Sequence, residues 1–577
     1  MPNVYSFSFP AVLVRTLLAV LLLALRLPAA AQAPAWQSAV AVATAAAAGN
    51  SSEVTATAVD AAGNVFLTGT FSNTVVMGST TLTSVGSSDV FVAKFNPVSN
   101  QFVWAHRAGG TGGDFSSALA VDGANVYVVG SFLSSTASFG PVTLTNANTN
   151  AFIYDVFVAK LTDAGNTGSF VWAQQIGGTG EDYTYTGALA VSGSSIYVAG
   201  AFGSSTVVLG STTLTNMGLQ DAFVAKLTDA GNTGSFVWAQ QAGGAGNDYA
   251  FTLALSGTSV YMAGEFGSPT IGLGTATLSN GGVSDLFVAK ITDVGNTASF
   301  TWAQRAGGTG RDYAGMLAVS GSSVYVAGSF ASPSVSFGPT TLTNAGPATG
   351  LPDVFVAKLA DAGSVGNFIW AQQAGGAGSD YATALALSGT NVYVTGDFNS
   401  PTAGFGSTML TNAGATDVFV AKLSDAGSTG NFRWAQQAGG TANDKGAALA
   451  VSGTSVYVGG SFRSLMANFG TTTLSNANAS NSLGFLASLT DPTLTPTAPS
   501  RALPPAQLYP NPARHTATLR LPAGTAPAPL TLTDALGRTV RCYPAPASPE
   551  TTLDLRGLPA GLYLLRGAGP AQRLQVE

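Results

Sequence analysis

A repeat of about 64–68 residues constrains the fold of this chain more than any other feature of its sequence. Seven tryptophans mark the repeat, with steps of 68, 68, 66, 64, 68 and 64 residues. They are Trp36, Trp104, Trp172, Trp238, Trp302, Trp370 and Trp434. The same segments return in the same order between successive tryptophans. Each repeat is therefore one structural unit that buries its apolar faces against its neighbours.

Each unit predicts four short β-strands. The segments "ALAVSG", "VYVAGSF", "DVFVAK" and "FVWAQQA" are rich in β-branched and aromatic residues, with Gly, Ser, Asn and Asp turns between them. In one second strand, Val126 and Val128 point to one face, and Tyr127 and Val129 point to the other. Strands that are apolar on both faces are expected in the stacked four-stranded sheets of a β-propeller. The long stretch between the second and third strands predicts an additional hairpin, as at 207–216.

The strand count predicts an all-β, seven-bladed β-propeller over residues 34–490. Each of the four strand types occurs seven times. The first tryptophan strand precedes everything else, and the last unit has no tryptophan strand after it. We expect the N-terminal strand to complete the last blade, because this closure leaves no open sheet edge.

The units resemble the SBBP repeats, a seven-bladed β-propeller family of bacterial surface and secreted proteins. The resemblance is carried by the Trp, "GGTGRDY", "LAVSGSSVYVAGSF" and "DVFVAKL" of 302–359, and it covers about 36–490. The first copy departs from the pattern, with Ser52 where the others have Asp. Because that family is defined by its fold more than by an activity, the resemblance implies architecture and little chemistry.

The pattern Gly-Gly-x-Gly-x-Asp is also that of calcium-binding nonapeptides, which wind into a parallel β-helix. Such a helix needs consecutive nonapeptides, since each metal ion lies between successive turns. Here the pattern occurs once per repeat, which excludes a calcium β-roll.

The two ends of the chain predict export. Residues 1–31 read as a signal peptide, with Arg15, an apolar run at 16–25 and small residues before the expected cleavage. No later stretch is apolar enough for a transmembrane helix. A Pro-rich linker at 491–507 precedes a domain at 508–577 with the strand pattern of a small β-sandwich.

This last domain resembles the C-terminal sorting domain of the type IX secretion system. "LYPNP" and "GLPAGLYLL" carry the resemblance, with sorting-motif residues Tyr509, Pro510, Asn511, Pro512, Gly561 and Tyr563. The resemblance implies recognition by an outer-membrane secretion machinery and delivery to the cell surface or the extracellular space.

Composition argues against several function classes. Only 9% of residues are charged, the net charge is −6, and there is no basic stripe, so nucleic acid is not an expected partner. With two histidines and no metal-binding or nucleophile motif, we expect neither catalysis nor a required cofactor. The expected mature protein is a monomer.

Two sets of repeated aspartates are candidate ligand groups. One follows Gly-Gly-x-Gly-x before the first strands, and the other begins the third strands, so both are expected on one face. The first set is Asp114, Asp182, Asp248, Asp312, Asp380 and Asp444; the second is Asp89, Asp155, Asp221, Asp285, Asp353 and Asp417. As a ring of acceptors they would hold cations such as calcium, or hydroxyl-rich ligands. The alternative, which six-fold repetition favours, is that each closes its own turn.

Sequence variation on the same face adds four candidate ligand contacts. Glu181 and Arg311 occupy a variable position before the first-strand Asp, and Glu265 and Asp397 replace a Ser or Ala of the second strand. These residues either contact a ligand or vary without functional consequence on a solvated surface. Glu265 and Asp397 would form a glycosidase-like carboxylate pair only if their side chains lie close together. Recurring lysines such as Lys290 predict exposed ion pairs.

The expected function is an exported, non-catalytic binding, adhesion or structural module with a glycan or protein ligand. The alternative is a carbohydrate-active lyase or hydrolase on the loop face.

Overall fold

The computed structural model describes residues 33–43, 49–148, 153–347, 350–494, 507–521, 529–534, 538–546, 548, 550–566 and 572–577. The chain forms two compact units, Met1–Pro496 and Thr497–Glu577, divided inside the predicted linker. The predicted signal peptide at 1–31 and linker residues 495–506 lie outside the described residues. Within the described ranges, no helix is long and apolar enough to cross a membrane.

In its described residues, the first unit contains seven antiparallel sheets of four main strands, called I to VII in chain order, besides two-stranded hairpins. The first strands are β2 (Ser51–Val59), β8 (Asp114–Asp122), β14 (Asp182–Tyr183) with β15 (Leu189–Ser192), β21 (Asp248–Ser256), β27 (Asp312–Ser320), β33 (Asp380–Ser388) and β39 (Asp444–Ser452). The second strands are β3 (Val65–Ser72), β9 (Asn125–Phe132), β16 (Ser195–Phe202), β22 (Ser259–Phe266), β28 (Ser323–Phe330), β34 (Asn391–Phe398) and β40 (Ser455–Phe462).

The third and fourth strands complete each sheet. The third strands are β6 (Asp89–Asn96), β12 (Asp155–Asp163), β19 (Asp221–Asp229), β25 (Asp285–Asp293), β31 (Asp353–Asp361), β37 (Asp417–Asp425) and β43 (Leu483–Thr490). The fourth strands, which carry the tryptophans, are β7 (Gln101–Gly110), β13 (Gly168–Ile176), β20 (Gly234–Ala242), β26 (Ala298–Ala306), β32 (Gly366–Gly375), β38 (Gly430–Ala438) and β1 (Trp36–Ala41).

The predicted hairpin lies between the second and third strands of every sheet. The hairpins are β4 (Thr74–Met77) with β5 (Thr80–Thr83), β10 (Thr136–Phe139) with β11 (Val142–Thr145), β17 (Thr206–Leu209) with β18 (Thr212–Thr215), β23 (Thr270–Leu273) with β24 (Ala276–Ser279), β29 (Ser334–Phe337) with β30 (Thr340–Thr343), β35 (Thr402–Phe405) with β36 (Thr408–Thr411), and β41 (Met466–Phe469) with β42 (Thr472–Ser475). Each extends its unit beyond a simple four-stranded sheet.

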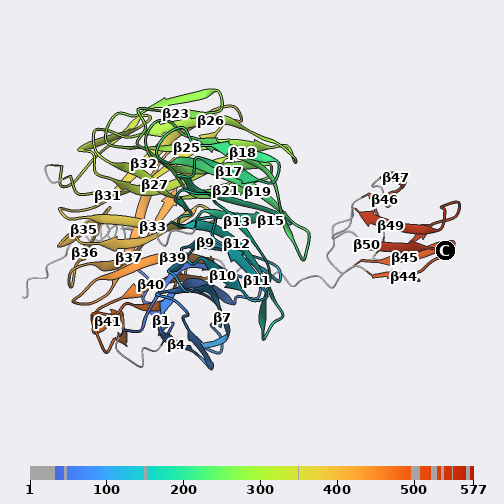
Figure 1. Cartoon of the computed structure of the whole chain (residues 1–577), viewed down its shortest axis with the longest axis horizontal. Helices are drawn as coiled ribbons and strands as arrows, with labels where there is room; N and C mark the ends of the chain where they lie inside the picture. Colours follow the sequence, from blue (N-terminus) through green and yellow to red (C-terminus); the bar gives the residue numbers. More distant parts are fainter. Residues whose placement is uncertain are drawn as a thin grey trace, which may run out of the picture. The chain divides into compact units, whose positions relative to one another are not determined.

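Successive sheets contact one another through their first strands. β2 contacts β8, β8 contacts β15, and the series continues through β21, β27 and β33 to β39, which contacts β2 again. Figure 1 shows this as a progression of chain colour from β7 through β23 and β35 back to β41, beside β1. The described residues of the unit contain no helix. The architecture is all-β and propeller-like.

The two ends of the repeat region meet in sheet VII. β1 pairs antiparallel with β43, with Trp36 opposite Leu489 and Ala41 opposite Phe485. The tryptophan strand that opens the chain's repeats thus lies beside the third strand of the last repeat.

The core lies between neighbouring sheets. The second strand β28 is buried from Val324 to Phe330, so both of its faces are covered, as the sequence predicted. One core cluster joins Tyr261 and Trp302 of sheet IV with Val326 and Phe355 of sheet V. A Cβ on Gly366 would lie 2.7 Å from the Trp302 ring, so the chain needs glycine where the next sheet crosses this tryptophan.

The described residues of the second unit form two sheets around one core. One sheet consists of β44 (Gln507–Tyr509), β45 (Thr516–Arg520) and β48 (Glu550–Asp554). The other consists of β46 (Leu530–Asp534), β47 (Thr539–Tyr543), β49 (Gly561–Arg566) and β50 (Gln572–Val576). Leu519 and Leu553 from the first sheet pack with Leu532 and Leu574 from the second, which is the arrangement of a small β-sandwich.

Candidate functional site

The loops that lead into the first strands meet the segments that lead into the third strands. Between sheets IV and V, Ser284 and Arg311 form a parallel bridge, and the Asp312 amide donates to the Ser284 carbonyl at 2.9 Å. At the junction of sheets VII and I, the Ser52 amide donates to the Ser482 carbonyl at 2.8 Å. The loops expected on one face are therefore joined by backbone hydrogen bonds.

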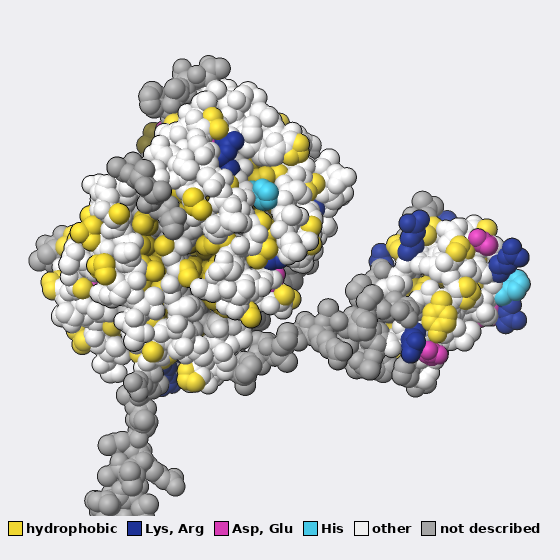
Figure 2. All heavy atoms as spheres, turned by 90° about the horizontal axis from the view of Figure 1, so that it is seen from below, with side chains coloured by type: hydrophobic (Ala, Val, Ile, Leu, Met, Phe, Trp, Pro, Cys, Tyr) yellow, Lys and Arg dark blue, Asp and Glu magenta, His cyan; other side chains and the backbone are white. Residues whose placement is uncertain are grey.

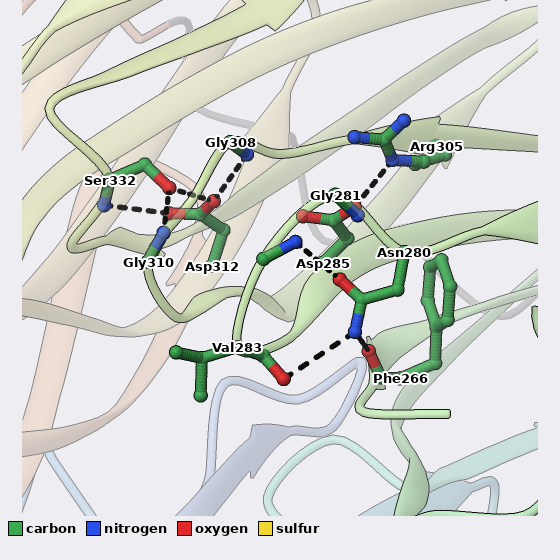
Figure 3. Close-up of polar contacts among 11 residues, drawn as sticks. Phe266, Asn280, Gly281, Val283, Asp285, Arg305, Gly308, Gly310, Asp312 and Ser332 are labelled. Carbon is green, nitrogen blue, oxygen red and sulfur yellow. Dashed lines mark hydrogen bonds and ion pairs between the residues drawn. The ribbon is translucent and has the colours of Figure 1, made fainter. Parts of the chain in front are cut away.

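The repeated aspartates of the first strands are buried and close their own turns. Asp312 is fully buried and accepts hydrogen bonds from the Gly308 amide at 2.8 Å and from the Ser332 hydroxyl at 2.6 Å (Figure 3). Each of the other five accepts from an equivalent serine hydroxyl at 2.6–2.7 Å. These serines are Ser134, Ser204, Ser268, Ser400 and Ser464. The geometry favours the turn-closing interpretation over a ring of open acceptors.

The aspartates that begin the third strands are also buried, but only one of their two oxygens is hydrogen-bonded. Oδ2 of Asp353 accepts from the Ala345 amide at 2.6 Å and from Gln373 at 2.7 Å. Oδ1 is buried and accepts no hydrogen bond of normal geometry within the described part of the chain. The same is true of Oδ1 in the other five: Asp89, Asp155, Asp221, Asp285 and Asp417.

The two aspartate sets face each other across the first glycine of the Gly-Gly turn. A Cβ built on Gly375 would lie 2.5 Å from Oδ1 of Asp353 and 2.9 Å from Oδ2 of Asp380. Gly375 also has φ +140°, so both the space and the backbone conformation require glycine there. Desolvation, the largest effect, raises the pKa of Asp353 to about 6, and the nearby Asp380 adds to the rise.

Two of the four variable residues form an ion pair. Arg311 donates to Glu265 from Nε at 2.9 Å and from Nη2 at 2.6 Å, and the Ser284 hydroxyl donates to the same carboxylate at 3.0 Å. Glu265 is 2% exposed, while the Arg311 side chain is 59% exposed and lies over the Tyr313 ring. A buried carboxylate therefore holds a solvent-facing guanidinium in place.

Glu181 and Asp397 lie elsewhere on the loop face. Glu181 is exposed. Burial is the main cause of the raised pKa of the Tyr183 hydroxyl, and the nearby Glu181 raises that pKa further. Asp397 belongs to sheet VI, where desolvation raises its pKa to about 7 against the opposing charge of Lys445. Glu265 belongs to sheet IV and Asp397 to sheet VI, with sheet V between them, so the two residues do not form one carboxylate pair.

An aromatic pocket lies at the first strands of sheets III to VI. Tyr185, Phe251, Tyr313 and Thr383 contribute to its lining together with Arg311, and its volume is about 320 Å³. The Tyr185 and Phe251 rings meet edge to face with centroids 4.7 Å apart. Sequence reasoning did not identify this pocket, although the signal was present: the residue three after the first-strand Asp is aromatic in sheets III and IV only.

Three of the residues that line the pocket lie at β-bulges. In β21, β27 and β33 the pairing with the second strand shifts register around Phe251, Gly315 and Thr383. A β-bulge turns one side chain out of the regular alternation of a strand. The residue at this position can therefore differ between repeats without disturbing the hydrogen bonds between the first and second strands.

The expectation of exposed lysine ion pairs was wrong. Lys290 pairs with Asp361 of the next sheet at 2.6 Å, and their side chains are 9% and 8% exposed. Tyr261 and Trp302 donate to the same carboxylate at 2.6 and 3.0 Å. The lysine lies on an inner strand of the stacked sheets, so its ammonium group meets the neighbouring turn and not water.

The predicted sorting-motif residues hold the end of the second unit together. Asn511 donates to the Arg573 carbonyl at 2.7 Å and accepts from the Gln575 amide at 2.8 Å, which fixes β50. Tyr563 donates to the Pro559 carbonyl at 2.8 Å. Figure 2 shows cationic side chains on the visible surface of this unit. Cys542, the chain's only cysteine, is exposed.

Comparison with solved structures returns proteins of low similarity. The WD40 domain of Neurospora crassa Pan2 is 10% identical at a TM-score of 0.39, covering 80% of this chain and 99% of that one. An endosialidase of phage phi92 is 11% identical at a TM-score of 0.33, covering 91% and 77%. Drosophila Semaphorin 2a is 6% identical at 0.27, covering 94% and 98%. No curated protein matches the chain.

The family comparison concerns the second unit. Residues 507–573 match the secretion system C-terminal sorting domain, which is the type IX sorting domain expected from "LYPNP" and "GLPAGLYLL". Such a domain marks proteins exported to the cell surface or the extracellular space, and it implies interaction with the secretion machinery. The chain is thus an exported protein with a propeller-like first unit and a C-terminal sorting domain.

Proposed function

We propose that the first unit is a seven-bladed β-propeller of the SBBP type that acts as a non-catalytic binding or adhesion module after export. In this proposal β1 closes the ring by completing the last blade, and residues 1–31 are the signal peptide. The contacts from β2 round to β39, and the pairing of β1 with β43, support the ring.

The observation that carries a binding role is the uneven distribution of aromatic residues on the first strands. The residue directly after the first-strand Asp is aromatic in sheets II to VI, but the residue three after that Asp is aromatic in sheets III and IV only, where Tyr185 and Phe251 form a half-buried aromatic group. The turn aspartates are equal in six repeats, but this aromatic group is not, and a single ligand site needs such asymmetry. Concave sites lined by aromatic side chains and a few polar groups are where proteins usually bind small ligands.

The absence of catalysis is part of the proposal, and the way in which two groups of carboxylates are held supports it. Glu265 is bound by Arg311 and Ser284, and the first-strand aspartates are occupied by their turns. In both arrangements the carboxylate oxygens already accept hydrogen bonds from groups of the protein. We therefore propose that no cofactor is required and that calcium has no role in binding.

Glycan-array binding by the full exported chain, with and without a calcium chelator, tests this function. We expect binding that is indifferent to chelation. Binding that disappears on chelation would assign the aspartates to a metal site. An absence of binding on glycan and protein arrays alike would contradict the binding role and leave a structural one.

A carbohydrate-active enzyme is a second candidate, favoured by Asp397. Asp397 is 7% exposed, burial raises its pKa to about 7, and groups with such pKa values serve as general acids. Incubation with the polysaccharides bound on the array distinguishes the two. Release of reducing ends that is lost in Asp397→Asn would establish catalysis, and no release is expected from a binding module.

A further inference from the structure

The aromatic pocket of sheets III to VI exists because one repeat lacks a side chain. Three residues after the first-strand Asp, sheets III and IV have Tyr185 and Phe251, while sheet V has Gly315; in sheets IV and V this position lies in a β-bulge. Gly315 is not required by the backbone. A Cβ there would make ordinary contacts, 3.6 Å from the Tyr313 ring and 3.8 Å from the Ala382 carbonyl, and its φ is not in the left-handed region. The missing side chain therefore leaves the pocket open, and neither crowding nor backbone conformation requires glycine at this position.

The walls of the pocket are aromatic faces at steep angles to one another. The Phe251 ring meets Tyr185 at 76° and Tyr313 at 86°, with centroids 4.7 and 6.0 Å apart. All three side chains are half-buried, so part of each ring remains open to a ligand. With a volume of about 320 Å³, the pocket is at the small end of ligand sites, which suits a compact ligand with apolar faces.

The charges at the rim favour a neutral ligand. The Arg311 guanidinium lies 5.4 Å from the centre of the Tyr313 ring, and this cation–π contact would repel a cationic ligand from that face. The buried carboxylate of Glu265 offsets the positive charge, so the pair offers little net attraction to an anion. Arg311 has five N–H donors, and its bonds to Glu265 use Nε and Nη2, which leaves Nη1 for an oxygen acceptor.

We propose that this pocket binds one ring of a neutral saccharide. The C–H face of a sugar ring carries small positive charges that meet the negative face of an aromatic ring. Its hydroxyls match the Arg311 Nη1 group and the hydroxyls of Thr186 and Thr383; the Thr383 hydroxyl donates to the Gly446 carbonyl, so it meets a ligand as an acceptor. The assignment rests on the proposed binding function and names the ligand class of that site.

The test measures binding of neutral hexasaccharides of glucose, mannose and xylose to the full chain by titration calorimetry. Uronate oligosaccharides, choline and an aromatic peptide serve as comparison probes. Gly315→Phe fills the pocket, and Phe251→Ala removes a wall. Ala447→Phe places the same ring at the equivalent position of β39, which does not line the pocket.

The expected result is binding of at least one neutral saccharide that falls at least tenfold in Gly315→Phe and in Phe251→Ala and is unchanged in Ala447→Phe. Neutral-saccharide binding that survives both pocket variants would overturn the assignment and leave the binding function intact. Preference for uronates, choline or peptide would overturn it in the same way. If no probe and no arrayed glycan or protein binds, both the assignment and the proposed function fail.

Discussion

Strand β31 carries one aspartate at each end, and the two ends hold their carboxylates in opposite ways. At its start, Asp353 faces another carboxylate, that of Asp380, and its Oδ1 is buried and accepts no hydrogen bond of normal geometry from the described residues. At its end, Asp361 receives an ammonium, a phenol and an indole from the preceding sheet. Each end of β31 contacts a neighbouring sheet. One contact is between two carboxylates that repel each other, and the other, at the opposite end of the same strand, is between a carboxylate and an ammonium group that attract each other.

The two environments shift the pKa values in opposite directions. Desolvation and the charge of Asp380 raise the pKa of Asp353, whereas the hydrogen bonds from Lys290, Tyr261 and Trp302 outweigh burial and lower that of Asp361. A raised pKa contributes stability that is full below pH 4 and is lost as pH rises through about 6. A lowered pKa contributes stability that is present at neutral pH and is lost as pH falls below about 4. The difference teaches that burial alone does not decide the ionisation of a repeated carboxylate; the charge of the group beside it, an ammonium for Asp361 and a carboxylate for Asp353, does.

Removing the cation from the attractive end should have the largest effect. Lys290→Met leaves Asp361 as a buried, uncompensated charge, and we expect the free energy of unfolding at pH 7 to fall by about 3–5 kcal/mol. Urea unfolding followed by tryptophan fluorescence measures it. Arg433→Ala, an exposed cation in sheet VI, is the matched control and should change stability by less than about 0.5 kcal/mol. A loss below about 1 kcal/mol in Lys290→Met would mean that water reaches Asp361.

Replacing a carboxylate at the repelling end should have a smaller effect of the opposite sign. In Asp353→Asn, the amide oxygen keeps the bonds from Ala345 and Gln373, and the amide nitrogen takes the place of Oδ1 and donates towards Asp380. We expect the variant to be more stable than the wild type by about 1–2 kcal/mol at pH 7, with little difference at pH 4. The pH dependence of the unfolding free energy between pH 4 and 7 should become less steep.

The control for this change is Asp285→Asn, because Arg305 already pairs with Asp285 (Figure 3). That variant leaves the guanidinium without its carboxylate and should be destabilised at pH 7. If both variants were stabilised equally, the contact with the second aspartate would not be the cause.

The sequence predicted the repeat architecture well because strand pattern and period depend on residues close along the chain. It placed the additional hairpins, the pairing of Trp36 with the last repeat and the sorting domain. It did not predict the burial of Lys290 or its partner, because Asp361 is 71 residues away and the contact depends on how the sheets stack. The pocket beside Gly315 was missed for a related reason: a register shift, and not the strand alternation, sets the direction of that side chain.

The smallest expected change in stability comes from replacing a residue of one repeat by the residue that other repeats have at the same position. The residue that donates to the third-strand Asp is Arg107 in sheet I and Arg305 in sheet IV, but Gln373 in sheet V. Gln373→Arg supplies a cation to Asp353, which offsets the repulsion from Asp380 when both are ionised. The side chains of Arg107 and Arg305 are 29% and 34% exposed, so solvent limits the expected gain to about 0–1 kcal/mol at pH 7. The gain should vanish at pH 4, where Asp353 is protonated, and unfolding at the two pH values measures it. An equal gain at both pH values would show that the arginine acts by packing and not by its charge. The repulsion between Asp353 and Asp380 would then be weaker than the comparison of the two ends of β31 assumes.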